Sequence, residues 1–93
     1  MDIEGLRKAA RDIWGDKPMT LQHIAVAMGV VYGDICRQAR QKIEAGEMSE
    51  EDLKKELGNL IFSVIRWCDD LGYDPEECVR LAQDAQKRYK ANR

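Results

Sequence analysis

Four segments of this chain carry apolar residues at intervals of three and four, and glycine or proline separates each segment from the next. Residues three or four apart lie on one face of an α-helix, so each segment predicts an amphipathic helix. We expect helices over residues 2–14, 20–44, 49–71 and 75–89, with no strand between them. Ninety-three residues are enough for one domain, 1–93. The predicted fold class is all-α, a four-helix bundle.

Local signals mark where these helices begin and end. Thr20 and Ser49 are typical N-cap residues, because their hydroxyl groups accept a hydrogen bond from a free backbone N–H of the first turn. Gly72 stands where a helix ends in the left-handed conformation. Asp74 and Pro75 then form the usual N-cap and first position of a helix. The sequence therefore predicts short connections between all four helices.

The third segment has the broadest apolar face. Its members are Leu53, Leu57, Leu60, Ile61, Val64, Trp67, Cys68 and Leu71. A helix with so wide a face needs neighbours on more than one side. A chain of this length offers few, so we expect a homodimer or a higher homo-oligomer that packs through the long helices. Two-fold dimers are the commonest arrangement of this kind.

Charge and cysteine content limit the partners and the compartment. The net charge of −2 gives no overall attraction to nucleic acid or to an anionic membrane. No apolar run approaches the ~20 residues that span a bilayer, and the first residues do not resemble a signal peptide. Cys36, Cys68 and Cys78 form no Cys-x-x-Cys pair, and His23 is the only histidine. We therefore expect a cytoplasmic protein with reduced thiols. We do not expect it to bind zinc, nucleic acid or a membrane.

Two short motifs carry a family resemblance. Residues Glu56 to Phe62 read Glu-Leu-Gly-Asn-Leu-Ile-Phe, and Leu71 to Glu77 read Leu-Gly-Tyr-Asp-Pro-Glu-Glu. In order and separation they resemble the third helix and following turn of the MazG-like, all-α nucleotide pyrophosphohydrolases. The resemblance implies a magnesium-dependent enzyme that cleaves nucleoside triphosphates to monophosphate and pyrophosphate. In that family, Glu-Glu-x-x-Glu on the second helix and Glu-x-x-Asp on the third direct carboxylates to the metal, since such spacings share one helix face.

Several carboxylates of that pattern are replaced in this chain. One variant of the second-helix motif reads Glu-Glu-x-Gly-Glu, and Gly33 aligns with its glycine. This alignment puts Val30 and Val31 where the family has its first two glutamates, and Asp34 at the third. Glu56 is retained as a metal ligand and catalytic carboxylate, and Asn59 replaces the aspartate. The resemblance thus implies a magnesium site with only two carboxylates. Carboxylate charge is what holds a hard cation, so we expect weak or absent turnover.

The resemblance also indicates how a nucleoside triphosphate would bind. Gln83, Lys87 and Arg88 correspond to the family's phosphate-binding positions on the fourth helix. A basic helix end is equally favoured by the helix dipole, with no ligand present. Trp14 and Tyr32 are candidates to stack on the base, although such rings also serve as core. The same residues without turnover describe a second class of protein, a non-catalytic nucleotide-binding or interaction module.

A small helix-turn-helix DNA-binding protein is the third class. Residues 20–30 resemble the opening of that motif, with Gly29 at the turn and residues 35–42 as the recognition helix. The side chains suited to bases or phosphates are Arg37, Gln38, Arg40 and Gln41. The negative net charge opposes this class, because duplex binding depends on neutralising phosphates. A sharp turn at residues 29–33 favours DNA binding, and a continuous helix favours the MazG-like fold.

Overall fold

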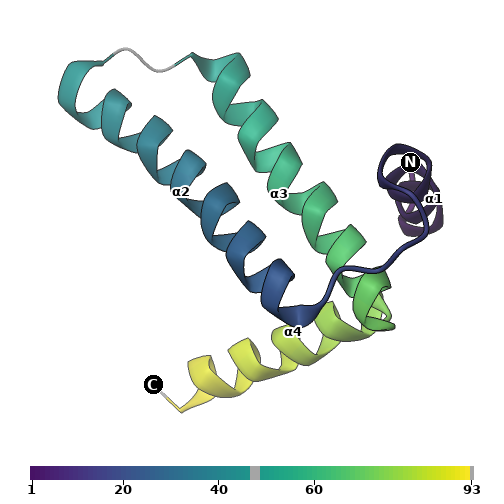
Figure 1. Ribbon diagram of the computed structural model, residues 1–93. Coiled ribbons are helices and arrows are strands. Elements are labelled where there is room, and N and C mark those ends of the chain that lie inside the picture. The colour runs from purple at the N-terminus through teal and green to yellow at the C-terminus, as the bar shows by residue number, and fades with distance from the viewer. Residues whose placement is uncertain (47–48, 93) are drawn as a thin grey trace.

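The computed structural model describes residues 1–46 and 49–92, and these form four helices packed together. They are α1 (Ile3–Trp14), α2 (Leu21–Ala45), α3 (Glu50–Leu71) and α4 (Pro75–Ala91) (Figure 1). No strand is present among the described residues. The all-α prediction is confirmed, and the helices begin and end within two residues of the expected positions.

Hydrogen bonds from side chains to the backbone set the helix starts. The Thr20 hydroxyl accepts from the backbone N–H of His23 at 3.2 Å, and the Ser49 hydroxyl accepts from that of Asp52 at 3.3 Å. At the start of α4 the Asp74 carboxylate accepts from the N–H of Glu76 at 3.0 Å. Each bond satisfies a donor that has no partner inside its helix. The predicted caps are therefore formed.

The turn between α3 and α4 depends on one glycine. Gly72 has a φ of 75°, in the left-handed region, and the next N–H, that of Tyr73, donates to the Cys68 carbonyl at 2.8 Å. Only glycine adopts this conformation without strain from a Cβ atom. The chain leaves α3 here and enters α4 three residues later.

The second helix is continuous. α2 runs for 25 residues and passes through Gly29 and Gly33 without a break. The turn that a helix-turn-helix requires at residues 29–33 is not formed, so the prediction of a helix-turn-helix in this segment is wrong. Packing of Ile24 and Val31 with Trp67 of α3 outweighs the roughly 1 kcal/mol that each interior glycine costs.

α3 is the central helix of the molecule. It contacts α2 on one side and α1 on the other, and α4 near its C-terminal end (Figure 1). α2 and α3 lie antiparallel and bury Ile24, Val31 and Trp67 between them. The half-buried side chains packed on this cluster are Met19, Ala27, Ile35, Leu60 and Leu71. The prediction that the broad face of the third helix needs more than one neighbour is confirmed.

α1 packs on the other side of α3. Ile65 and Trp67 are both buried, and two residues of a helix are separated by about 200° around its axis. Trp67 faces α2, so Ile65 faces the opposite way, and α1 buries Ala10. Charged groups join the two helices at the edge of this contact, where Arg11 forms two hydrogen bonds of 2.9 Å with Asp69. α1 and α2 therefore do not share one core.

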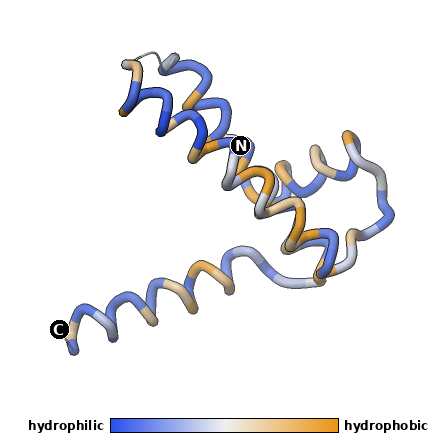
Figure 2. Tube along the Cα trace, turned by 60° about the vertical axis from the view of Figure 1, so that its left-hand side comes forward, coloured by the Kyte–Doolittle hydropathy of each residue, from blue (hydrophilic) through white to orange (hydrophobic). Residues whose placement is uncertain are grey.

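The last helix diverges from the other three. Pro75 is buried at its start, whereas every residue from Val79 to Asn92 is exposed. Figures 1 and 2 both show the C-terminal half of α4 running away from α2 and α3. The radius of gyration is 15.7 Å, whereas a compact domain of this length has about 12 Å. A single chain is therefore an open assembly of helices. No described helix is both long enough and apolar enough to cross a bilayer.

Candidate functional site

The candidate metal ligands lie on one side of the α2–α3 pair. Asp34 immediately precedes the core residue Ile35 on α2, and Asn59 immediately precedes the core residue Leu60 on α3. In two antiparallel helices, residues that precede a core position in this way lie on the same side of the pair. Glu56 is one turn before Leu60 and is half-buried at the edge of the contact between α2 and α3. The three ligand positions thus share a polar side of the pair.

Two of these three side chains already have partners within their own helix. The Asp34 carboxylate pairs with Arg37, whose Nη2 donates at 3.1 Å. The Asn59 amide oxygen accepts a 3.5 Å hydrogen bond from the Ser63 hydroxyl. Within the described residues, Glu56 makes neither a hydrogen bond nor an ion pair. Of the three candidate ligands, Glu56 is therefore the one whose side chain is not already paired.

The positions of the missing family glutamates have different surroundings. Val31 is 9% exposed and belongs to the core cluster with Trp67. Val30 is 60% exposed on the outer surface of α2. Val31 therefore has a packing role. A glutamate in its place would bury an unpaired carboxylate among apolar side chains, which is costly.

These donors form only a small ligand set for a metal. Across residues 1–46 and 49–92, no three side chains of His, Cys, Asp or Glu lie close enough together to hold an ion. Magnesium prefers six oxygen ligands and takes several of them from water and phosphate. Asp34, Glu56 and Asn59 do not fit a magnesium ion by themselves, since they supply two carboxylates and one amide.

The candidate phosphate-binding residues lie on a different part of the molecule. Gln83, Lys87 and Arg88 are exposed on the C-terminal half of α4. That half of α4 lies apart from the N-terminal half of α3, which carries Glu56 (Figures 1 and 2). One chain does not bring the basic residues and the carboxylates together.

The two candidate stacking rings are also separated. Trp14 is 61% exposed at the end of α1, and the Arg66 guanidinium lies 4.7 Å from its ring centroid. Tyr32 is exposed on α2, which packs on the other side of α3 from α1. A hydrogen bond with Cys36 raises the pKa of Tyr32. The two rings therefore do not line one pocket.

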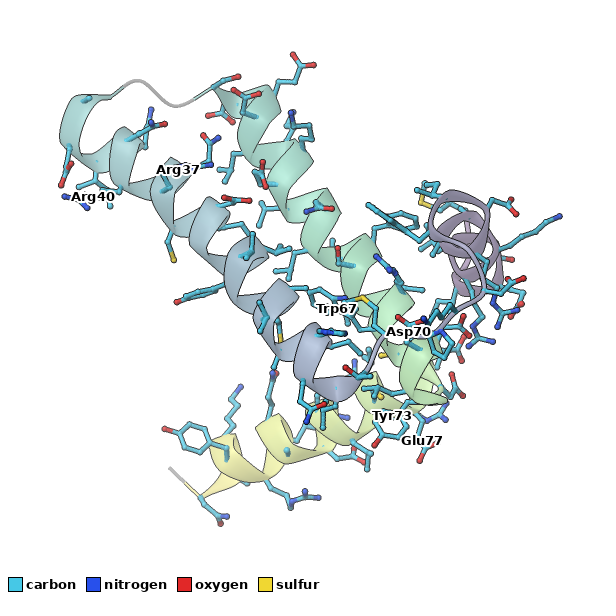
Figure 3. All side chains as sticks on the ribbon, viewed as in Figure 1. Arg37, Arg40, Trp67, Asp70, Tyr73 and Glu77 are labelled. Carbon is cyan, nitrogen blue, oxygen red and sulfur yellow. The ribbon has the colours of Figure 1, made fainter. Side chains whose placement is uncertain are left out.

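A charged cluster at the C-terminal end of α3 was not singled out from the sequence. Asp69 pairs with Arg11 and lies 3.3 Å from the Nε of Arg7, and hydrogen bonding to Asp69 raises the pKa of Arg11. Open hollows of about 540 and 590 Å³ flank Asp69. Figure 3 shows the neighbouring Asp70 near Trp67 at this end of α3. The sequence does carry a signal for this cluster. Asp69 and Asp70 are adjacent at the C-terminal end of a helix, where the helix dipole disfavours negative charge, and this indicates that cationic side chains from elsewhere in the chain pair with them.

Comparison of the chain with protein-family models, with curated proteins and with solved structures gives no match. The family resemblance therefore rests on the sequence motifs of this chain alone.

Proposed function

We propose that this protein is a divergent member of the MazG-like nucleotide pyrophosphohydrolase family that binds nucleoside triphosphates on the polar side of the α2–α3 pair. The observation that supports this best is the shared side of Asp34, Glu56 and Asn59 on two long antiparallel helices. The uninterrupted α2 is the form of that segment that the family resemblance implies. The free cysteines are consistent with a reducing cytoplasm.

The expected activity is weak or absent. A bound magnesium ion would neutralise charge on the phosphates. Two carboxylates leave most of its coordination to water and to the triphosphate, so we expect a low affinity for the metal. Asp34 is also held by Arg37, which competes for its charge. Glu56, which has no partner among the described residues, is the side chain on which any turnover would depend.

The test is pyrophosphate release from a panel of ribo- and deoxyribonucleoside triphosphates, first with magnesium and then with manganese. Glu56→Gln removes one negative charge and keeps nearly the same shape, so it is the matched variant. Slow turnover that Glu56→Gln abolishes supports the proposal. Turnover that is equal in both proteins contradicts the role of Glu56 and points to a contaminating enzyme.

A non-catalytic nucleotide-binding module is the second candidate. The small ligand set, with no three metal-binding side chains together in the described part of the chain, favours it. Equilibrium dialysis with ATP, with and without EDTA, separates the two candidates. Binding without turnover supports the module, whereas a folded protein that neither binds nor hydrolyses any nucleotide in the panel contradicts both.

A further inference from the structure

Two of the three cysteines lie where α3 ends and α4 begins. Cys68 is in the last turn of α3, and Cys78 is in the first turn of α4, ten positions later. Both are half-buried free thiols, whereas Cys36 is exposed on α2. Every described residue after Cys78 is exposed. The pair therefore stands at the point where α4 leaves the rest of the molecule.

The turn between the two helices brings these positions together. The N–H of Gly72 donates to the Asp69 carbonyl at 3.1 Å, and that of Tyr73 donates to the Cys68 carbonyl at 2.8 Å. At a helix end of this type, the residue in the place of Tyr73 commonly packs on the residue in the place of Cys68. At a helix start, the residue before the N-cap, which is again Tyr73, commonly packs on the fourth helical residue, here Cys78. Both patterns converge on Tyr73.

The two cysteine side chains also interact directly. Burial raises the pKa of the Cys68 thiol, and the charge of Cys78 and a side-chain hydrogen bond with Cys78 raise it further. A disulfide requires two cysteines that face each other, with Cα atoms roughly 4.4–6.8 Å apart. Side chains that share a hydrogen bond already face each other, so a small adjustment of the first turn of α4 is enough to form the bond.

A hollow gives small molecules access to Cys78. It has a volume of about 280 Å³, and its lining is Gly72, Tyr73, Asp74, Glu77, Cys78 and Leu81. Figure 3 shows Tyr73 and Glu77 at this junction of α3 and α4. Cys68 is not part of the lining. The carboxylates of Asp74 and Glu77 disfavour anionic molecules here, so a cationic or neutral reagent is better suited to this hollow.

We propose that Cys68 and Cys78 are a redox-sensitive pair, which a low-molecular-weight disulfide oxidises to an intramolecular disulfide that ties the first turn of α4 to α3. The Cys78 thiolate, which borders the hollow, attacks one sulfur of the small disulfide, forms a mixed disulfide and releases a small thiolate. The Cys68 thiolate then attacks the Cys78 sulfur and releases the second small thiolate. The two protons that the cysteines lose go to the two released thiolates, so one disulfide is reduced as the other forms.

This chemistry is independent of the proposed nucleotide site. Disulfides in a reducing cytoplasm are usually transient and respond to oxidants. The pair would therefore stay reduced until the oxidant concentration rises. Neither cysteine is a candidate ligand for magnesium or phosphate, so failure of one proposal leaves the other unaffected.

The experiment equilibrates the reduced full chain in buffers of fixed ratio of cysteamine to cystamine, a small cationic disulfide. Free thiols are then blocked with N-ethylmaleimide, and the protein is digested with trypsin. Trypsin cleaves on both sides of residues 67–80, so Cys68 and Cys78 leave in one peptide and Cys36 in another. Mass spectrometry identifies the internal disulfide as the loss of two hydrogen atoms from residues 67–80 with no adduct.

Three variants and one denatured sample are the controls. Cys68→Ser and Cys78→Ser each remove one partner, so the remaining cysteine should end as a mixed disulfide with cysteamine. Cys36→Ser is the matched control and should form the internal disulfide to the same extent as wild type. The same equilibrium in concentrated urea measures what closeness in the sequence contributes alone. Circular dichroism verifies that each variant stays helical.

The expected result is an internal disulfide in wild type and in Cys36→Ser, with an equilibrium constant at least tenfold higher in the folded chain than in urea. A folded protein whose residues 67–80 carry only blocked thiols or cysteamine adducts at every ratio would contradict the proposal. An equilibrium constant no higher in the folded chain than in urea would also overturn it, because the fold would then not bring the pair together.

Discussion

The Arg11 guanidinium forms two parallel hydrogen bonds with the Asp69 carboxylate, each 2.9 Å long, and so joins two residues 58 positions apart. Such a planar two-point pair fixes both distance and orientation. Arg7 adds a second positive charge, with its buried Nε 3.3 Å from the same carboxylate but outside hydrogen-bonding geometry. Asp69 therefore joins α1 to the end of α3 through both arginines, at the edge of their apolar contact.

We expect Asp69→Ala to lower the free energy of unfolding by about 1 kcal/mol, because it removes the hydrogen bonds from Arg11 and the negative charge beside Arg7. Urea denaturation followed by circular dichroism measures the change. Asp84→Ala is the control, since Asp84 is an exposed carboxylate on α4 and should change stability by less than about 0.5 kcal/mol. Equal midpoints for the two variants would show that the cluster contributes nothing.

The small core predicts a steep response to the loss of volume at Ile24. This side chain is 1% exposed and lies between α2 and α3. Ile24→Val should cost about 0.5–1.5 kcal/mol and Ile24→Ala about 2–5 kcal/mol. Both are measured by urea denaturation at one protein concentration, because any association of chains also stabilises the folded state. A loss below 1 kcal/mol for Ile24→Ala would mean that the α2–α3 contact is loose.

Two glycines should respond in opposite directions to alanine. Gly29 lies inside α2 with no atom within 4 Å of the position of a Cβ, so Gly29→Ala should stabilise the helix by about 0.5–1 kcal/mol. Gly72 has a positive φ, so Gly72→Ala should destabilise the protein by roughly 1–2 kcal/mol. Thermal unfolding of the two variants gives the comparison. Destabilisation by Gly29→Ala would indicate that another chain approaches the backbone there.

Cys68 predicts a loss of stability at alkaline pH. Burial raises the pKa of its thiol, and the nearby Cys78 raises it further. The folded state then keeps a proton that the unfolded state releases above its ordinary pKa of about 8.5. The free energy of unfolding should therefore fall as the pH rises above about 8.5, whereas below this pH the contribution is complete.

The measurement is urea denaturation under reducing conditions across that pH range. Cys68→Ala should flatten the dependence, and Cys36→Ala, at an exposed cysteine, should retain it. A slope that is the same in all three proteins would assign the effect to other groups.

The helix boundaries were predictable because their causes are local. The caps at Thr20, Ser49 and Asp74 and the turn at Gly72 each depend on residues within one helical turn. The continuity of α2 through Gly29 was left open by the sequence, since a glycine is compatible with both a turn and a helix. Contact with α3 decides it, and that contact is a tertiary effect.

The arrangement of the helices was not predictable in the same way. Periodicity shows that α3 has a broad apolar face, but it does not say which helix covers which part. It gave no sign that α1 and α2 lie on opposite sides of α3, or that α4 diverges. The pairing of Arg11 with Asp69 joins distant segments and leaves no short-range pattern. For the candidate site, the sequence placed Asp34, Glu56 and Asn59 on two helices. The antiparallel arrangement of these helices puts the three residues on one side of the pair. Lys87 and Arg88 lie on a different part of the molecule.

The central position of α3 has a consequence for how freely the chain can vary. A substitution in α3 meets α1, α2 or the start of α4, depending on which way its side chain points. From Val79 onward, α4 is exposed at every described position. Sequence change is therefore expected to accumulate in the outer part of α4 much faster than in α3. A fourth helix whose sequence can change with little effect on stability can acquire new contacts while the other three helices maintain the fold.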